Sequence, residues 1–166
     1  EFQESQQSLS TLLSNLPGMV YRCLNDRNWT METVSEGCFE LTGYQPAELI
    51  GNRDAAYADL IHPDERDGVW EQVQAAVEPR KPFQLEYPIR TREGSWEWVW
   101  EQGRGLFAAD GSLAALEGFI TGIGDRKRVE EVLRRERDFN TTLIQSSPVF
   151  FVAINAASDI LLMNEM

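Results

Sequence analysis

The segment that decides the fold is residues 83–100, FQLEYPIRTREGSWEWVW. Apolar and polar side chains alternate along residues 83–90, and they alternate again along residues 96–100, after the turn residues Arg92, Glu93 and Gly94. Strict alternation is typical of a half-buried strand, and a short Gly-containing turn between two such runs is typical of a hairpin. Residues 83–100 therefore predict a β-hairpin.

A third strand is expected over residues 113–123, after the turn at residues 109–111, so that the hairpin becomes a three-stranded meander. Both faces of this third strand are largely apolar, whereas a sheet with one face in water alternates more cleanly. We therefore expect the outer face of the sheet to be covered by the opening helix, by a second protomer, or by both.

The residues before the hairpin predict two further strands and several helices. Strands are expected over 19–24 and 29–35, short helices over 36–43 and 46–51, an irregular stretch up to Pro63, and one longer helix over 64–77. Residues 5–16 carry leucines at helical spacing and predict a short amphipathic helix. The fold class is therefore α+β, a five-stranded antiparallel sheet with short helices on one face, flanked by N-terminal and C-terminal amphipathic helices.

The C-terminal part of the sequence predicts one long helix, followed by a repeat of the strand arrangement at the start of the chain. In residues 125–145, Val129, Val132, Glu136, Phe139 and Leu143 follow a heptad spacing, which indicates a short coiled coil. Residues 149–154 and 159–164 read as two strands, which repeats the arrangement at the start of the chain. We interpret these two strands as part of a truncated internal repeat.

Composition narrows the function classes. The 166 residues carry a formal charge of −12, which opposes binding to nucleic acid, and the basic residues at 126–137 alternate with acidic ones, as on a solvated helix face. No apolar run reaches the length that spans a bilayer, and the first residues lack the pattern of a signal peptide, so we expect a cytoplasmic segment without membrane insertion. No phosphate loop or hydrolase signature occurs in the sequence, so an enzyme is not expected.

Five stretches in this order resemble the PAS domain family: VSEGCFELTGY (34–44), PAELIG (46–51), IHPDER (61–66), REGSWEWV (92–99), and FIT (119–121) running on to RKRVEE (126–131). The resemblance covers about residues 8–143. It implies an N-terminal helix over 1–17, a PAS sensor domain over 18–124, a signalling helix over 125–147, and the start of a second PAS domain over 148–166.

The resemblance also implies a function. The chain resembles a regulatory module of a bacterial multi-PAS signalling protein, not itself an enzyme, with an output domain in the same polypeptide, such as a diguanylate cyclase, a histidine kinase or another PAS domain. The apolar stripes of the opening helix and of residues 125–145 predict a homodimer through the N-terminal and C-terminal helices. Where the family usually ends its last strand with Asp-Ile-Thr, this chain has Gly122-Ile123-Gly124, which puts the usual route of signal exit in doubt.

Two hypotheses concern the core of the domain. In the first, a small molecule binds in an apolar cavity of roughly 300 Å³ or more, lined by Phe39, Tyr57, Val69, Val73, Tyr87, Ile89, Trp98, Phe119 and Thr121. In the second, bulky aromatic side chains fill the core, and the domain is a ligand-free dimerisation or spacer module. The identity of any cofactor stays unknown.

Three conspicuous residue types are better explained by structure than by chemistry. A haem or metal site at His62, the only histidine, would need further ligands, so we expect His62 to precede the long helix near its cap. Cys38 does not stand where the photoactive cysteine of LOV flavoproteins stands, so a flavin adduct is not expected. The tryptophans at 96, 98 and 100 share one face of a strand and are expected to pack in a core or an interface.

Overall fold

The structure is a computed structural model, and it describes residues 17–146, 152–154 and 160–163. The chain divides into two compact units, with the division between Gly124 and Asp125. The opening helix expected over residues 5–16 lies outside the described residues.

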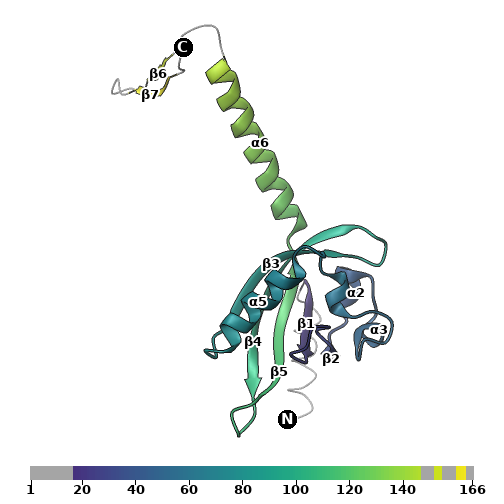
Figure 1. Cartoon of the computed structure of the whole chain (residues 1–166). Coiled ribbons are helices and arrows are strands. Elements are labelled where there is room, and N and C mark those ends of the chain that lie inside the picture. The colour runs from purple at the N-terminus through teal and green to yellow at the C-terminus, as the bar shows by residue number, and fades with distance from the viewer. Residues whose placement is uncertain (1–16, 147–151, 155–159, 164–166) are drawn as a thin grey trace, which may run out of the picture. The chain divides into compact units, whose positions relative to one another are not determined.

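The first unit is built on one five-stranded antiparallel sheet, as predicted. Its strand order is β2-β1-β5-β4-β3, so β5 lies in the middle of the sheet between β1 and β4 (Figure 1). The three-stranded meander expected from the alternation is present as β3, β4 and β5. The strands are β1 (Met19–Cys23), β2 (Met31–Val34), β3 (Phe83–Arg90), β4 (Trp96–Phe107) and β5 (Leu113–Gly122).

Four helices between β2 and β3 belong to this unit: α2 (Gly37–Thr42), α3 (Pro46–Leu49), α4 (Tyr57–Leu60) and α5 (Arg66–Val77). The first turn of α3 is fixed by a capping box between Gln45 and Glu48, with Pro46 at the position that tolerates it best. Three of the four were expected from the sequence. The fourth, α4, falls in the stretch that was expected to be irregular.

The two faces of the sheet differ in burial. On β3 the buried residues alternate with exposed ones, and Leu85, Tyr87 and Ile89 point into the core. Their partners on β4 are Glu101, Val99 and Glu97, and directly opposed residues of two strands share a face. The inner face of β4 therefore carries Val99 and Glu101, both buried.

The outer face carries the tryptophans of β4. Trp98 is 38% exposed, and Trp100 is opposed on β5 by Thr121, which lies on the same face. The hydroxyl of Thr121 donates a hydrogen bond to the carbonyl of Pro17, two residues before β1 begins. This contact places the Pro17 carbonyl at the outer face of the sheet.

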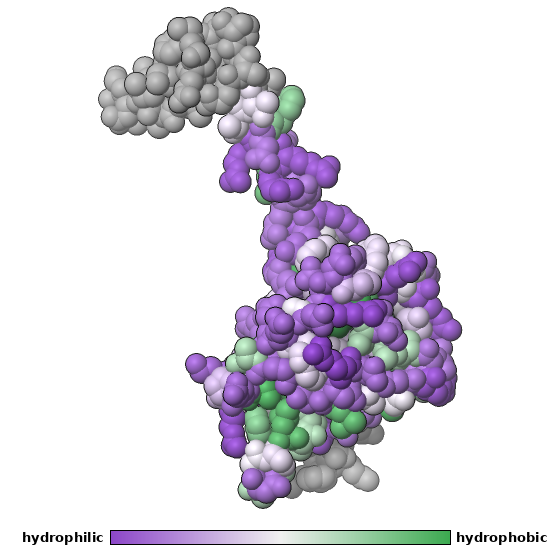
Figure 2. All heavy atoms as spheres, in the orientation of Figure 1, coloured by the Kyte–Doolittle hydropathy of each residue, from purple (hydrophilic) through white to green (hydrophobic). Residues whose placement is uncertain are grey.

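The second unit contains the long helix α6 (Gly124–Ser146) and a two-stranded antiparallel sheet of β6 (Val152–Ile154) and β7 (Ile160–Met163). Ion pairs between residues three or four apart link several basic side chains of α6 to acidic ones, such as Arg135 to Glu131 at 2.8 Å. Much of α6 facing the viewer in Figure 2 is hydrophilic. Its exposed apolar side chains are Val129, Val132, Leu133 and Phe139.

Candidate functional site

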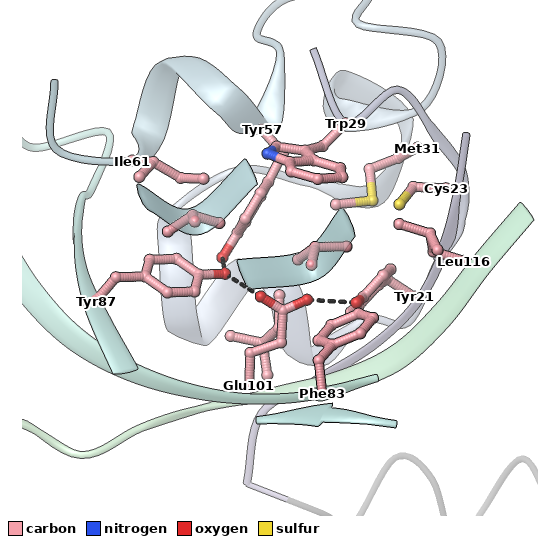
Figure 3. A pocket seen from close by; sticks show the side chains of 13 residues that line it. Tyr21, Cys23, Trp29, Met31, Tyr57, Ile61, Phe83, Tyr87, Glu101 and Leu116 are labelled. Atoms are coloured by element: carbon pink, nitrogen blue, oxygen red, sulfur yellow. Dashed lines mark hydrogen bonds between the residues drawn. The ribbon is translucent and has the colours of Figure 1, made fainter. Parts of the chain in front are cut away.

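A buried carboxyl lies at the centre of the first unit. Glu101 of β4 is 7% exposed, and it is the one buried acidic side chain in the described part of the chain. Its Oε1 accepts a hydrogen bond from the Tyr21 hydroxyl of β1, and its Oε2 accepts one from the Tyr87 hydroxyl of β3 at 2.5 Å. The Tyr87 hydroxyl is also 3.3 Å from the Tyr57 hydroxyl of α4 (Figure 3). We call these four residues the Glu101 cluster.

Two glycines let Tyr21 reach Glu101 from two strands away. Tyr21 is opposed by Gly118 on β5, and Gly118 is opposed by Gly103 on β4. A Cβ atom at either glycine would lie 2.8 Å from the Tyr21 hydroxyl oxygen. The absence of side chains at Gly103 and Gly118 therefore clears the space through which the tyrosine ring crosses β5.

Burial sets the electrostatics of the cluster. It raises the pKa of the Glu101 carboxyl, while the hydrogen bonds from Tyr21 and Tyr87 act in the opposite direction and lower it. Burial, followed by the nearby Glu101 charge, raises the pKa of both Tyr21 and Tyr87 well above the ordinary range. The tyrosines are therefore neutral donors, and the carboxyl is the group of the cluster that can change charge.

The cavity beside the cluster is very small. Its volume is about 10 Å³, roughly the space that one water molecule needs. Its walls combine the cluster with aromatic, aliphatic and sulfur-containing side chains (Figure 3), namely Tyr21, Cys23, Trp29, Met31, Tyr57, Ile61, Val69, Val73, Phe83, Tyr87, Glu101, Leu116 and Ile120. The core is filled in this structure.

Of the nine residues predicted to line a cavity, the structure brings four together there: Tyr57, Val69, Val73 and Tyr87. Ile89 is fully buried in the core but is not among the residues that line the cavity. Phe39 of α2 is 49% exposed, so its expected position in the core is wrong.

The other three predicted residues, Trp98, Phe119 and Thr121, lie on the outer face of the sheet, and their expected inward orientation is wrong. The pairing of β4 with β5 explains why, because Phe119 is opposed by Gln102 and Thr121 by Trp100. A shift of one residue moves a side chain to the other face of a strand. The inner face of β5 is instead formed by Leu116 and Ile120.

Glu101 was missed by sequence reasoning, although one signal pointed to it. In the β3–β4 hairpin, the register that follows from the turn pairs residue 101 with Leu85. The alternation along β3 places Leu85 among its apolar positions. Cross-strand partners share a face. The charge at position 101 therefore had to point into the core.

His62 lies just before α5, as expected. Its backbone N–H donates to the carbonyl of Pro88 at 3.0 Å, and its ring lies against that of Trp96 with the ring centroids 4.6 Å apart. No group of three or more histidine, cysteine, aspartate or glutamate side chains in the described ranges is placed to hold a metal ion.

Both cysteines are buried free thiols. Burial raises the pKa of the Cys38 thiol to about 12, and this thiol donates to the carbonyl of Tyr44 at 3.2 Å. Cys23 lines the small cavity. High pKa values keep both side chains in the less reactive thiol form.

The exit from the sheet runs through Gly122, Ile123 and Gly124. The Ile123 N–H donates to the carbonyl of Trp98 at 2.8 Å, which extends the pairing of β4 with the end of β5. A Cβ atom at Gly124 would lie 2.2 Å from a carboxylate oxygen of Glu97 on β4. Glycine at position 124 therefore permits the Glu97 carboxylate to approach the first residue of α6.

None of the helices in the described ranges is both long enough and apolar enough to cross a bilayer.

Comparison with known proteins agrees with this fold. The family described as the PAS fold matches residues 31–120, which is more than half of the chain, so the chain belongs to the PAS family. Its first compact unit is thus a PAS domain, a regulatory and sensory class of domain.

Among relatives, the methyl sulfide methyltransferase-associated sensor of Methanosarcina acetivorans is 28% identical over 131 residues. An uncharacterised protein of Sinorhizobium fredii is 27% identical over 111 residues. These alignments cover 78% and 67% of this chain, but only 13% of either relative. The chain thus spans a small part of the length of the curated relatives it matches.

Among solved structures, a sensory box histidine kinase/response regulator from Burkholderia thailandensis is similar with a TM-score of 0.63 and 28% identity, over 82% of this chain and 98% of that one. The N-terminal domain of a diguanylate cyclase with a PAS/PAC sensor from Marinobacter aquaeolei has a TM-score of 0.56 at 17% identity, over 66% of this chain and 98% of that one. The second likeness concerns the fold alone.

Proposed function

We propose that this PAS domain is a non-catalytic relay with a filled core, which passes a change of state through β5 and α6 to an output domain in the same polypeptide. The observation that carries the proposal is the cavity of about 10 Å³. Pockets that bind metabolites or cofactors have volumes of roughly 300 Å³ or more. The volume therefore favours a relay over a receptor with a preformed pocket in its core.

The sheet offers a direct route for the relay. β5 pairs with β1 on one side and with β4 on the other, and these neighbours carry Tyr21 and Glu101 of the cluster. Beyond Gly122 the chain enters α6 after a single intervening residue. A change in the cluster therefore acts on β5 from both edges, and β5 is covalently joined to the helix that leaves the domain.

The proposed output is control of a following domain by paired copies of α6. The apolar side chains of α6 are more than half exposed, with Val132 at 58% and Phe139 at 63%, and their spacing suits a parallel two-stranded coiled coil. The similar proteins named as sensor, histidine kinase and diguanylate cyclase support an attached effector of such a kind. We also assign the cytoplasm as the site of action in this proposal.

Native mass spectrometry of the purified chain, with an absorption spectrum of the same sample, tests the filled core. The relay predicts masses of the bare chain and of its dimer, and no visible absorption band. A small molecule that co-purifies in stoichiometric amount, or a chromophore band, would overturn the filled-core proposal in favour of a ligand receptor.

Pairing through α6 is tested on the same instrument with two variants that add the same charge. Val132→Asp places a carboxylate on the expected seam, and Thr141→Asp places one at an exposed position on the opposite side of the heptad. The proposal expects the first variant to lose the dimer and the second to keep it. Equal dimer fractions in the two variants would show that α6 does not form the interface.

A further inference from the structure

Among the described residues, no cationic side chain lies beside the Glu101 carboxyl. The groups that face it are Tyr21 and Cys23 from β1, Tyr57 from α4 and Tyr87 from β3, together with apolar side chains. None of the thirteen residues that line the cavity is arginine, lysine or histidine. A buried carboxylate without a counter-charge is costly, so burial favours the protonated, neutral acid.

The hydrogen bonds of the cluster favour the opposite state. Three contacts join the four side chains, and the three tyrosine hydroxyls bring three protons to them. With Glu101 ionised, Tyr21 and Tyr87 donate to the two carboxylate oxygens and Tyr57 donates to the Tyr87 oxygen. Every hydroxyl proton then has an acceptor, which is the arrangement that a buried polar network needs.

A fourth proton cannot be placed on the same three contacts. If Glu101 takes up a proton on Oε2, it donates to Tyr87, Tyr87 must then donate to Tyr57, and the Tyr57 proton is left without an acceptor. If Glu101 takes up the proton on Oε1, the carboxyl donates to the Tyr21 oxygen, and the Tyr21 hydroxyl proton is left without an acceptor. A buried donor without an acceptor is unfavourable, so uptake of the proton favours a rearrangement of the cluster.

The two ends of the cluster are held differently. Tyr21 lies in β1, which is paired on both sides with β2 and β5. Tyr57 lies in α4, a helix of four residues, and its hydroxyl contact with Tyr87 is 3.3 Å long, whereas the Tyr21 hydroxyl lies closer to Glu101. The contact at the Tyr57 end is therefore the weaker of the two.

We infer that the Glu101 cluster is a proton-binding site, in which protonation of Glu101 leaves the Tyr57 hydroxyl proton without an acceptor and makes α4 shift relative to the sheet. A proton can enter a filled core without needing a pocket. This inference deepens the proposed relay by naming its input, and it rests on that proposal only for the step from the sheet to α6.

The test is a pH titration of the whole chain by NMR, with glutamate labelled at the side-chain carboxyl carbon. One carboxyl signal is expected to titrate well above the others, to be absent in Glu101→Gln, and to persist in Glu71→Gln, which removes an exposed carboxyl of α5. The backbone amide signals of α4 are expected to shift with the same midpoint. A Glu101 signal that titrates together with the surface carboxyls, or that never titrates while the chain is folded, overturns the inference.

The variant Tyr57→Phe separates proton binding from its structural consequence. It removes the Tyr57 hydroxyl, so the Glu101 signal should still titrate while the shift of the α4 amides is lost. An unchanged α4 shift in this variant would contradict the role given to Tyr57.

The relay is judged separately, by the dimer fraction on either side of the titration midpoint. If the cluster titrates and α4 shifts but the dimer fraction does not change, the proton site is supported and the relay is overturned.

Discussion

Two glutamates in the middle of the same sheet face opposite ways. Glu101 of β4 points into the core and is held by tyrosine hydroxyls, with no cation among the residues around the cavity. Glu117 of β5 points outward and pairs with Arg104 of β4, with Nη2 and Oε1 2.6 Å apart. The outer pair is in contact with water, whereas the inner carboxyl depends on neutral donors.

The comparison shows that the electrostatic environment of a glutamate depends on the face of the sheet that it occupies. An exposed ion pair contributes little to stability because water and salt screen it. A desolvated carboxyl is strongly coupled to its surroundings, because its charge and its hydrogen bonds make opposing demands. Only the inner glutamate can make the fold respond to a change in its own charge.

The largest effect is expected where the inner arrangement is broken sterically. In Gly118→Ala the new Cβ would lie 2.5 Å from the backbone carbonyl oxygen of Gln102 and 2.8 Å from the Tyr21 hydroxyl. Because backbone cannot easily give way, we expect the free energy of unfolding to fall by about 3 kcal/mol, measured by chemical denaturation.

The matched control is Gly68→Ala in α5, where a Cβ would have no neighbour within 4 Å. Alanine in a helix is favoured over glycine by about 0.5–1 kcal/mol, so this variant should be slightly more stable than the parent. Similar losses in the two alanine variants would mean that the passage for Tyr21 does not need glycine.

The second largest loss of stability is expected when the Glu101 carboxyl loses one of its hydrogen-bond donors. Tyr87→Phe leaves Oε2 of Glu101 without its donor and the Tyr57 hydroxyl without its partner. We expect a loss of about 1–3 kcal/mol in the free energy of unfolding, which thermal or chemical denaturation can measure. Tyr44→Phe, which removes a half-buried hydroxyl outside the cluster, serves as the control and should cost much less. Equal losses of stability in Tyr87→Phe and Tyr44→Phe would show that the Tyr87 hydroxyl contributes no more than a hydroxyl outside the cluster.

The smallest effect is expected on the outer face. Glu117→Gln removes the charge that pairs with Arg104, whose side chain is 68% exposed. Exposed pairs contribute about 0.2–1 kcal/mol, and the contribution decreases with salt. Denaturation in low and high salt should therefore give a small difference that fades as salt is added. A loss as large as that of Tyr87→Phe would contradict the contrast between the two faces.

The sequence was sufficient for the strands and for most helices. Alternation over residues 83–90 and 96–100 identified the hairpin, and the structure has β3 and β4 at these positions. Long periodic segments such as α5 and α6 were also recognisable, because their apolar residues repeat at helical spacing.

Features that depend on tertiary contacts were not predictable in the same way. Helix α4 has four residues, too few to show a period, and the Ala58 N–H is held by the carbonyl of Asn28, which is distant in the sequence. The inward face of β5 was misassigned because both of its faces are apolar, so hydrophobicity alone could not choose between Phe119 and Ile120. On β4 the pattern itself was misleading, because the more apolar face, with its three tryptophans, is the outer one, and the inner face carries Glu101.

The most direct test of the account compares the parent chain with Glu101→Gln by chemical denaturation from about pH 5 to about pH 8. The folded carboxyl has a raised pKa, so in the range between its unfolded and folded pKa values the folded state binds more protons, and stability falls as pH rises. The parent should therefore lose stability relative to Glu101→Gln as pH rises, by about 1.4 kcal/mol for each unit by which the pKa is raised. Glu71→Gln should follow the parent. Parallel curves for the parent and Glu101→Gln would show that Glu101 does not couple protonation to folding, and would contradict the account.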